Sequence, residues 1–152
     1  MRKLQALTAY IMEVTDLPRE NVQSFADKGE LTPTGRDLGH GIELGVFKYD
    51  AVIQIENYPG DGHAMLALLL GWLCDHDPDR ELNELAEPEV DADLNDDRTV
   101  DLEIAVEFEE PLCLVPDDDG EIRFNGRRWR VVGDVPVDVA EKLESLDGRA
   151  DG

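Results

Sequence analysis

Positively charged residues and cysteines are both scarce in this chain. Lysine and arginine together number 14 against 36 aspartates and glutamates, which gives a net charge of −22 over 152 residues. Nucleic-acid binding needs a cationic surface for the phosphates, so this balance argues against it, and likewise against binding to an anionic membrane surface. The two cysteines, Cys74 and Cys113, are far apart and form no disulfide framework, which indicates a reducing cytoplasm.

Long hydrophobic stretches are missing as well. The apolar run at 64–73 is about half of the roughly 20 residues that span a bilayer, so we expect no membrane helix. We also expect no secretory or transit signal, because residues 1–4 lead directly into a helical pattern. A hydrophobic content of 41% predicts a globular protein. The length predicts one domain over residues 1–146, with a frayed end at 147–152.

Motifs that carry catalysis or bind a cofactor are not found. The sequence has no glycine-rich phosphate loop, no Gly-x-Ser-x-Gly and no His-Glu-x-x-His. Asp91-x-Asp93-x-Asn95 resembles the opening of a calcium loop, but Asp96 replaces the required glycine and Leu102 replaces the closing glutamate. We therefore predict no enzyme, no cofactor and no metal.

The rest of the chain is organised around one strand, one turn and one helix. Residues 42–57 predict a long strand, and Tyr58-Pro59-Gly60 interrupts it. Asp61 is placed to cap a helix over 62–76, which Asp77-Pro78 then ends. This helix has almost no polar face, so it must be buried on more than one side. Either it lies at the centre of this chain's core, or one side packs on a neighbouring subunit.

Other segments are predicted to cover this centre. Residues 2–15 have the spacing of an amphipathic helix with Leu4, Leu7, Ile11 and Val14 on one side. Residues 18–29 are predicted to form a short helix with Val22 and Phe25 as its apolar contacts, and residues 30–41 a loop, with or without a short strand, that includes the lone His40. The remaining predictions are a change of strand face at 45–47, an acidic connector at 79–88, a strand end at Pro111, and a short helix from Pro136 with Val139, Leu143 and Leu146.

Two strands with clean alternation, 90–94 and 100–108, predict an acidic hairpin. Their apolar rows match only if the connecting loop has an odd number of residues, most simply 95–97. That register places Asp91 opposite Asp101 and Glu89 opposite Glu103. Asp91, Asp93, Asp101 and Glu103 then form a wall of carboxylates, which we call the carboxylate wall. Like charges in this arrangement oppose each other, so we expect added salt or divalent cations to stabilise the fold.

Asn125-Gly126 predicts a second hairpin with opposite charge. A two-residue turn pairs Ile122 with Trp129 and places three arginines on one face. Within this acidic chain they either pair with nearby acids of the same copy or dock on the carboxylate wall of a neighbouring copy, head to tail, to build a closed ring. The three residues, which we call the arginine face, are Arg123, Arg128 and Arg130.

Two stretches resemble the R-type tail completion proteins of contractile-tailed bacteriophages. The first runs from Tyr49 to Asp79, and the second is Asp91 to Asp97 with the strand that follows. The resemblance covers about residues 1–110 and lies in the order and spacing of motifs rather than in a catalytic residue. The motif residues that carry it are Tyr58, Gly60, Asp61, Trp72, Leu73 and Asn95.

The resemblance implies a structural protein similar to tail terminators. Such proteins cap the head-proximal end of the tail tube, contribute to the head–tail joint and assemble as rings, usually six-fold. It implies an α+β fold, a single domain with a mostly antiparallel (mixed) sheet and helices packed on it. It also implies as partners further copies of the chain, tube and sheath proteins and head–tail connectors, with DNA passing but not tightly bound. The location implied is the virion tail of a phage or tail-like particle, assembled in the bacterial cytoplasm.

Two other classes stay open on composition. One is an acidic protein that mimics nucleic acid and inhibits a basic partner. The other is a domain adapted to high salt, in which the acidic surface maintains solubility. Neither explains the resemblance over 49–79.

Overall fold

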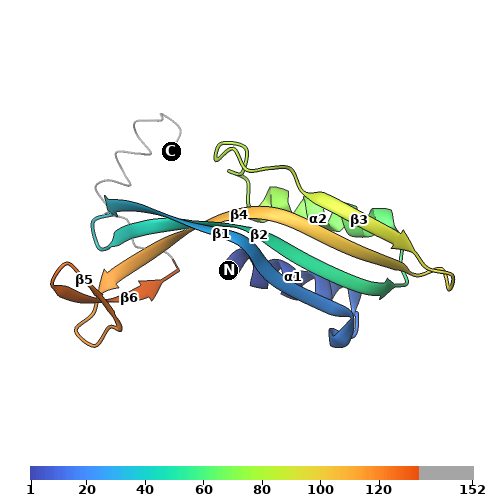
Figure 1. Cartoon of the computed structure of the whole chain (residues 1–152), viewed down its shortest axis with the longest axis horizontal. Helices are drawn as coiled ribbons and strands as arrows, with labels where there is room; N and C mark the ends of the chain where they lie inside the picture. Colours follow the sequence, from blue (N-terminus) through green and yellow to red (C-terminus); the bar gives the residue numbers. More distant parts are fainter. Residues whose placement is uncertain (134–152) are drawn as a thin grey trace. The chain divides into compact units, whose positions relative to one another are not determined.

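The fold combines helices with a sheet. In a computed structural model that describes residues 1–133, two α-helices accompany a six-stranded sheet (Figure 1). β3, β4, β5 and β6 form antiparallel pairs, which confirms the predicted α+β class. The elements in order are α1 (Arg2–Thr15), a 3₁₀ helix (Arg19–Asn21), β1 (Val22–Asp37), β2 (Ile42–Tyr58), α2 (Gly62–His76), β3 (Glu89–Leu94), β4 (Val100–Pro116), β5 (Ile122–Phe124) and β6 (Arg127–Val132).

The chain falls into two compact units. The first consists of Met1–Glu30 and Lys48–Glu110, and the second of Leu31–Phe47 and, among the described residues, 111–133. The sheet has the strand order β1-β2-β4-β6-β5, with β3 also paired to β4. The predicted helix from Pro136 and the predicted frayed end at 147–152 lie outside the described residues, and a single domain over 1–146 stays a prediction.

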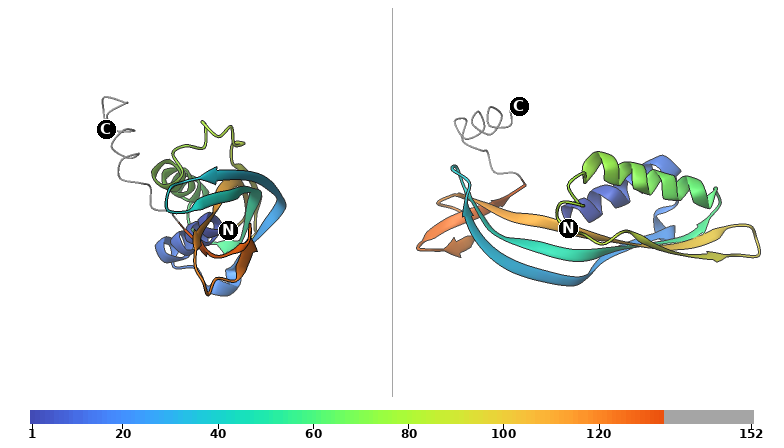
Figure 2. Two further views of the ribbon diagram at one scale, coloured as in Figure 1. Left: turned by 90° about the vertical axis from the view of Figure 1, so that its left-hand side faces the viewer. Right: turned by 90° about the horizontal axis from the view of Figure 1, so that it is seen from above.

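The core of the first unit lies between its sheet and its helices. Both α1 and α2 pack on the same face of this part of the sheet (Figure 2). Alternate side chains of β2 and β4 point to that face because successive residues of a strand point to opposite sides. The buried residues are Leu4, Leu7 and Ile11 of α1, Met65, Leu69, Trp72 and Leu73 of α2, Tyr49, Ala51, Ile53 and Ile55 of β2, and Leu102, Ile104, Val106 and Phe108 of β4.

The helix α2 has the predicted bounds. The Asp61 carboxylate accepts a hydrogen bond from the backbone amide of His63 at 3.0 Å, and the helix ends before Asp77. Within residues 1–133, however, burial of this helix is confined to one side. Leu70, on the other side, is 54% exposed, and Cys74 is exposed too. Burial of this outer side by a neighbouring subunit stays a prediction.

The predicted helix from Pro18 to Gly29 was wrong, and the strand within 30–41 is longer than predicted, since the loop between β1 and β2 consists only of residues 38–41. Only Arg19–Asn21 form a short 3₁₀ helix, and β1 then extends over 16 residues. Almost all side chains of β1 are exposed, so the segment shows no apolar alternation that would reveal a strand. Val14, which the helical pattern placed on the buried side of α1, is 52% exposed.

Two predictions about the long strands were also wrong. Along β2 the buried positions are odd-numbered apart from Val52, from Glu43 and Gly45 through Tyr49 to Ile55, so no change of face occurs at 45–47. β4 continues through Pro111 to Pro116. Pro111 lies between the part of β4 that pairs with β3 and the part that pairs with β6. On that edge of β4, residue 111 has no partner strand, so the N–H that proline lacks is not needed there.

The second unit contains the β5–β6 hairpin and the ends of β1, β2 and β4. Trp129 is buried, and its indole nitrogen donates to the carbonyl of Phe124 at 2.8 Å. A Cβ on Gly120 would lie 2.1 Å from the carbonyl oxygen of Trp129, so only glycine fits there. Glu43 is buried as well, and it accepts a hydrogen bond from the Thr34 hydroxyl at 2.7 Å.

Candidate functional site

The carboxylate wall is present, but in a register shifted by two residues. Asp91 lies opposite Glu103, and Asp93 opposite Asp101. The predicted pairing of Asp91 with Asp101 was therefore wrong, while the like-charge pairing itself persists. The predicted loop length of three residues is right, but the loop lies one residue further along the chain than predicted. Asn95 donates its backbone amide to the Thr99 carbonyl at 2.9 Å, so the turn consists of residues 96–98 rather than 95–97.

Polar side chains of the same unit support only part of this wall. Gln54 donates to Glu103 at 2.7 Å. Asp101 accepts two hydrogen bonds, one from the backbone amide of Asn57 at 2.8 Å and one from the side-chain amide of Asn95 at 2.9 Å. These two hydrogen bonds hold the pKa of Asp101 below its usual value.

Asp91 and Asp93 are exposed, and neither forms an ion pair within residues 1–133. The wall therefore presents excess negative charge to its surroundings.

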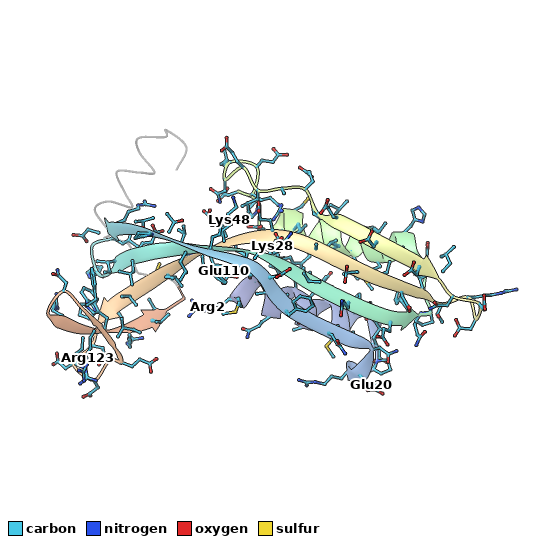
Figure 3. The ribbon with its side chains drawn as sticks, in the orientation of Figure 1. Arg2, Glu20, Lys28, Lys48, Glu110 and Arg123 are labelled. Atoms are coloured by element: carbon cyan, nitrogen blue, oxygen red, sulfur yellow. The ribbon has the colours of Figure 1, made fainter. Side chains whose placement is uncertain are left out.

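The arginine hairpin has the predicted register. Ile122 lies opposite Trp129, and Arg123 opposite Arg128. Asn125 and Gly126 have φ of 54° and 74°, the left-handed conformation that a two-residue turn of this type requires. Figure 3 shows Arg123 on this hairpin, at the surface.

The arginines differ in how they are paired within the chain. Arg130 faces Asp117 at 3.5 Å, and Arg128 donates through Nε to the carbonyl of Gly120 at 2.7 Å. Arg123 has no ion pair among the described residues. Internal pairing therefore accounts for Arg130, whereas Arg123 remains available for an outside carboxylate.

The motif residues serve the local structure. Asp61 caps α2, and Tyr58 lies so close to Gly60 that a Cβ there would be 2.5 Å from the Tyr58 hydroxyl. Trp72 is buried and meets the Phe108 ring edge-on, with ring centroids 6.2 Å apart. Leu73 is buried beside it. Asn95 ties the β3–β4 turn to the wall through its bond to Asp101.

A buried carboxylate that sequence reasoning missed lies at Glu110. It accepts hydrogen bonds from the amino group of Met1 at 2.9 Å, from the backbone amides of Arg2 and Lys3, and from the Tyr49 hydroxyl. Burial raises the pKa of Glu110, but these hydrogen bonds outweigh burial and leave the pKa lowered. Burial and the same carboxylate raise the pKa of Tyr49. Strand alternation could have revealed the site, because Glu110 continues the inward row of β4.

A second missed carboxylate is Asp77, at the end of α2. It is 4% exposed and lies between Lys3 Nζ at 2.8 Å and Arg80 Nη1 at 2.7 Å. Both cations also lie over the ring of Phe108, at 5.9 and 6.0 Å from its centroid. The cluster joins α1, the connector after α2 and β4, and no sequence pattern pointed to it.

Neither cluster has the composition of a metal centre. Over residues 1–133, no three His, Cys, Asp or Glu side chains are grouped so that they could hold a metal ion. The helices of this part of the chain are all too short or too polar to cross a membrane. What the surface offers is two charged hairpins of opposite sign, and such an arrangement is suited to binding other protein surfaces.

Comparison with known proteins places the chain among the structural proteins of bacteriophage tails. The family "P2 phage tail completion protein R (GpR)" matches residues 1–132, and the chain belongs to this family. A 19.2 kDa protein from the rep–hol intergenic region of Haemophilus phage HP1 (strain HP1c1) is 31% identical over 147 residues, which is 92% of this chain and 87% of the phage protein. No solved structure matches. The resemblance found in the sequence is thereby confirmed at the level of the family.

Proposed function

We propose that this chain caps and completes the tail tube at its head-proximal end and contributes to the head–tail joint. The observation that carries this proposal is the family match over residues 1–132, which includes every described helix and strand. In this role the protein is structural and not an enzyme. Its partners are further copies of itself, tube and sheath proteins and the head–tail connector, within the tail of a contractile virion or a related particle.

The capping copies form a closed ring, which we expect to have six members. A ring requires each copy to carry two complementary surfaces, because head-to-tail contacts close only when one surface binds the other. The carboxylate wall and the arginine face supply such a pair. Arg123 and Arg128 are the main contacts, since Arg130 already faces Asp117 at 3.5 Å within its own copy.

The acidic charge also suits a ring whose bore passes DNA. Carboxylates repel phosphates, so a net charge of −22 disfavours retention of the genome in the channel. Replacing Asp91, Asp93, Asp101 and Glu103 by their amides should then slow DNA passage into the host. Unchanged infectivity of particles that contain the amide variant would contradict this part of the proposal.

The ring itself is tested by native mass spectrometry at low and moderate ionic strength, with negative-stain images of the same samples. We expect a closed ring of about six copies, which Arg123→Glu loosens. Arg19→Glu is the matched control, because Arg19 is exposed and has no ion pair among the described residues. Rings that neither substitution changes would leave the function in place and remove the arginine face from the interface.

The capping role has a separate test in whole particles. A phage in which this gene is disabled should produce tubes of irregular length that do not join heads. Supplying the intact chain from a plasmid should restore tails of one length. Normal, head-joined tails in the absence of the chain would contradict the proposed function.

A further inference from the structure

Two strands of the sheet each have one edge without a backbone partner. β3 pairs only with β4, and β5 pairs only with β6, among the residues that the structure describes. The outer edge of each strand therefore presents unpaired N–H and C=O groups. Such an edge is a template for a further strand.

The same two strands have matching faces of opposite charge. On one face β3 carries Asp91 and Asp93, while β5 carries Arg123. On the other face both strands are apolar and exposed. Leu94 of β3 is 84% exposed and Phe124 of β5 is 39% exposed. Because side chains alternate with a period of two, a register that matches the charged faces also brings the apolar faces together.

We infer that β5 of one copy adds to the free edge of β3 in a second copy, so that the sheet continues from one subunit into the next. Arg123 then lies opposite Asp93, and Ile122 and Phe124 flank it against Ala92 and Leu94. Arg123 is the central residue of β5, so parallel and antiparallel addition differ in which of its two neighbours lies opposite Leu94. The inference rests on the proposed ring and specifies how its two surfaces join.

The third free edge of the described sheet does not offer the same match. The outer edge of β1 is also unpaired. Its charged residues in the first unit, Asp27, Lys28 and Glu30, are of mixed sign. β1 therefore lacks the block of negative charge that would select the arginine hairpin, and β3 is the edge that fits β5.

Cross-linking between copies tests the pairing directly. In a Cys74→Ser background, which removes the exposed native thiol, one preparation carries Phe124→Cys and another carries Leu94→Cys or Ala92→Cys. Directly opposite Cβ atoms of paired strands lie about 4.5–5.5 Å apart, within reach of a disulfide after slight adjustment. Mixing the two preparations under mild oxidation should yield a covalent dimer with Leu94→Cys for a parallel addition or Ala92→Cys for an antiparallel one.

Leu82→Cys is the matched control. Leu82 is 82% exposed, nearly the same as Leu94 at 84%, but it lies in the connector after α2 and not on a strand edge. Mixed with Phe124→Cys, it should give at most one tenth of the cross-linked product.

The assembly state of the same mixtures, measured by native mass spectrometry, separates two kinds of failure. Rings without a cross-link from Ala92 or Leu94, or with equal cross-linking from Leu82, would overturn the strand pairing and leave the proposed function intact. A chain that forms no assembly under any condition would overturn both.

Discussion

Carboxylates on the two faces of the first unit differ in their burial and in their cationic partners. On the face that packs against the helices, Asp77 and Glu110 are buried, and each has cationic partners as well as hydrogen bonds. On the opposite face, Asp91 lies opposite Glu103 and Asp93 opposite Asp101, and the described residues supply no cation to any of the four.

A buried charge has to be neutralised within the chain, because burial without a partner costs several kcal/mol. An exposed charge can stay uncompensated at small cost. The excess on the outer face is therefore free to be matched by another molecule. Among residues 1–133, the arginine hairpin is a surface with the complementary charge.

Asp77 should give the largest effect. Asp77→Ala leaves Lys3 and Arg80 half-buried without their shared carboxylate, so we expect the free energy of unfolding to fall by about 3–5 kcal/mol. Denaturant unfolding monitored by far-UV circular dichroism measures the change. Asp79→Ala, at an exposed position two residues away, should change it by less than about 0.5 kcal/mol. Equal effects would show that the buried cluster contributes nothing special.

Glu110 should show a smaller, pH-dependent effect. Its folded-state pKa lies below the ordinary value of 4.5, so its contribution is fully present above that value and is lost as the pH falls through the folded-state pKa. At pH 7, Glu110→Gln should lower the free energy of unfolding by about 2 kcal/mol. Below about pH 4.5 the difference from the parent chain should shrink. Glu109→Gln is the neighbouring control, and a pH-independent difference for Glu110→Gln would contradict the account.

Removing a carboxylate from the carboxylate wall should raise the stability of the chain rather than lower it. Asp93→Asn removes one like-charge pair, so we expect it to stabilise the unassembled chain by up to about 1 kcal/mol at low salt. The gain should shrink as sodium chloride or magnesium chloride is added, because salt screens exposed charges. The parent chain should itself melt at a higher temperature in added salt. A melting temperature that does not depend on salt would show that the wall carries no electrostatic cost.

The turn of the acidic hairpin should give the smallest effect. Arg98 has a φ of 68°, which suits glycine better than arginine. We expect Arg98→Gly to stabilise the chain by about 0.5 kcal/mol, as relief of backbone strain is partly offset by the greater freedom of glycine in the unfolded state. Gly126→Ala, at a φ of 74° in the other hairpin, should destabilise it by about 1 kcal/mol. Thermal melts of the two variants side by side provide the measurement.

The two hairpins also show what could be predicted from sequence. Asn125-Gly126 fixes both the length and the place of its turn, and the register of β5 and β6 followed correctly. In the acidic hairpin, alternation determined that the loop is odd, but several positions satisfied that condition. Side-chain bonds made the choice. Asp97 accepts hydrogen bonds from the backbone amide and the hydroxyl of Thr99. Arg98 adopts a left-handed backbone conformation that an arginine in the sequence does not predict.

For the other elements, the accuracy of the prediction depended on how clear the local sequence pattern is. The bounds of α2 were predicted because a cap, a nearly continuous apolar run and a proline agree. β1 was missed because its side chains are exposed and its stability comes from backbone pairing with β2. The ion cluster at Asp77 brings together residues 3, 77 and 80 through tertiary packing, which no spacing in the sequence encodes.

The central claim is that the arginine hairpin of one copy binds the carboxylate wall of another. Exchanging one charge between these two surfaces tests it. The single variants Arg123→Glu and Asp93→Arg should each weaken assembly by at least about tenfold, as measured by mass photometry or sedimentation against concentration. The chain that carries both substitutions should recover the assembly of the parent, since the exchanged charges meet again across the interface. Assembly of the double variant no better than that of the weaker single variant would contradict the claim.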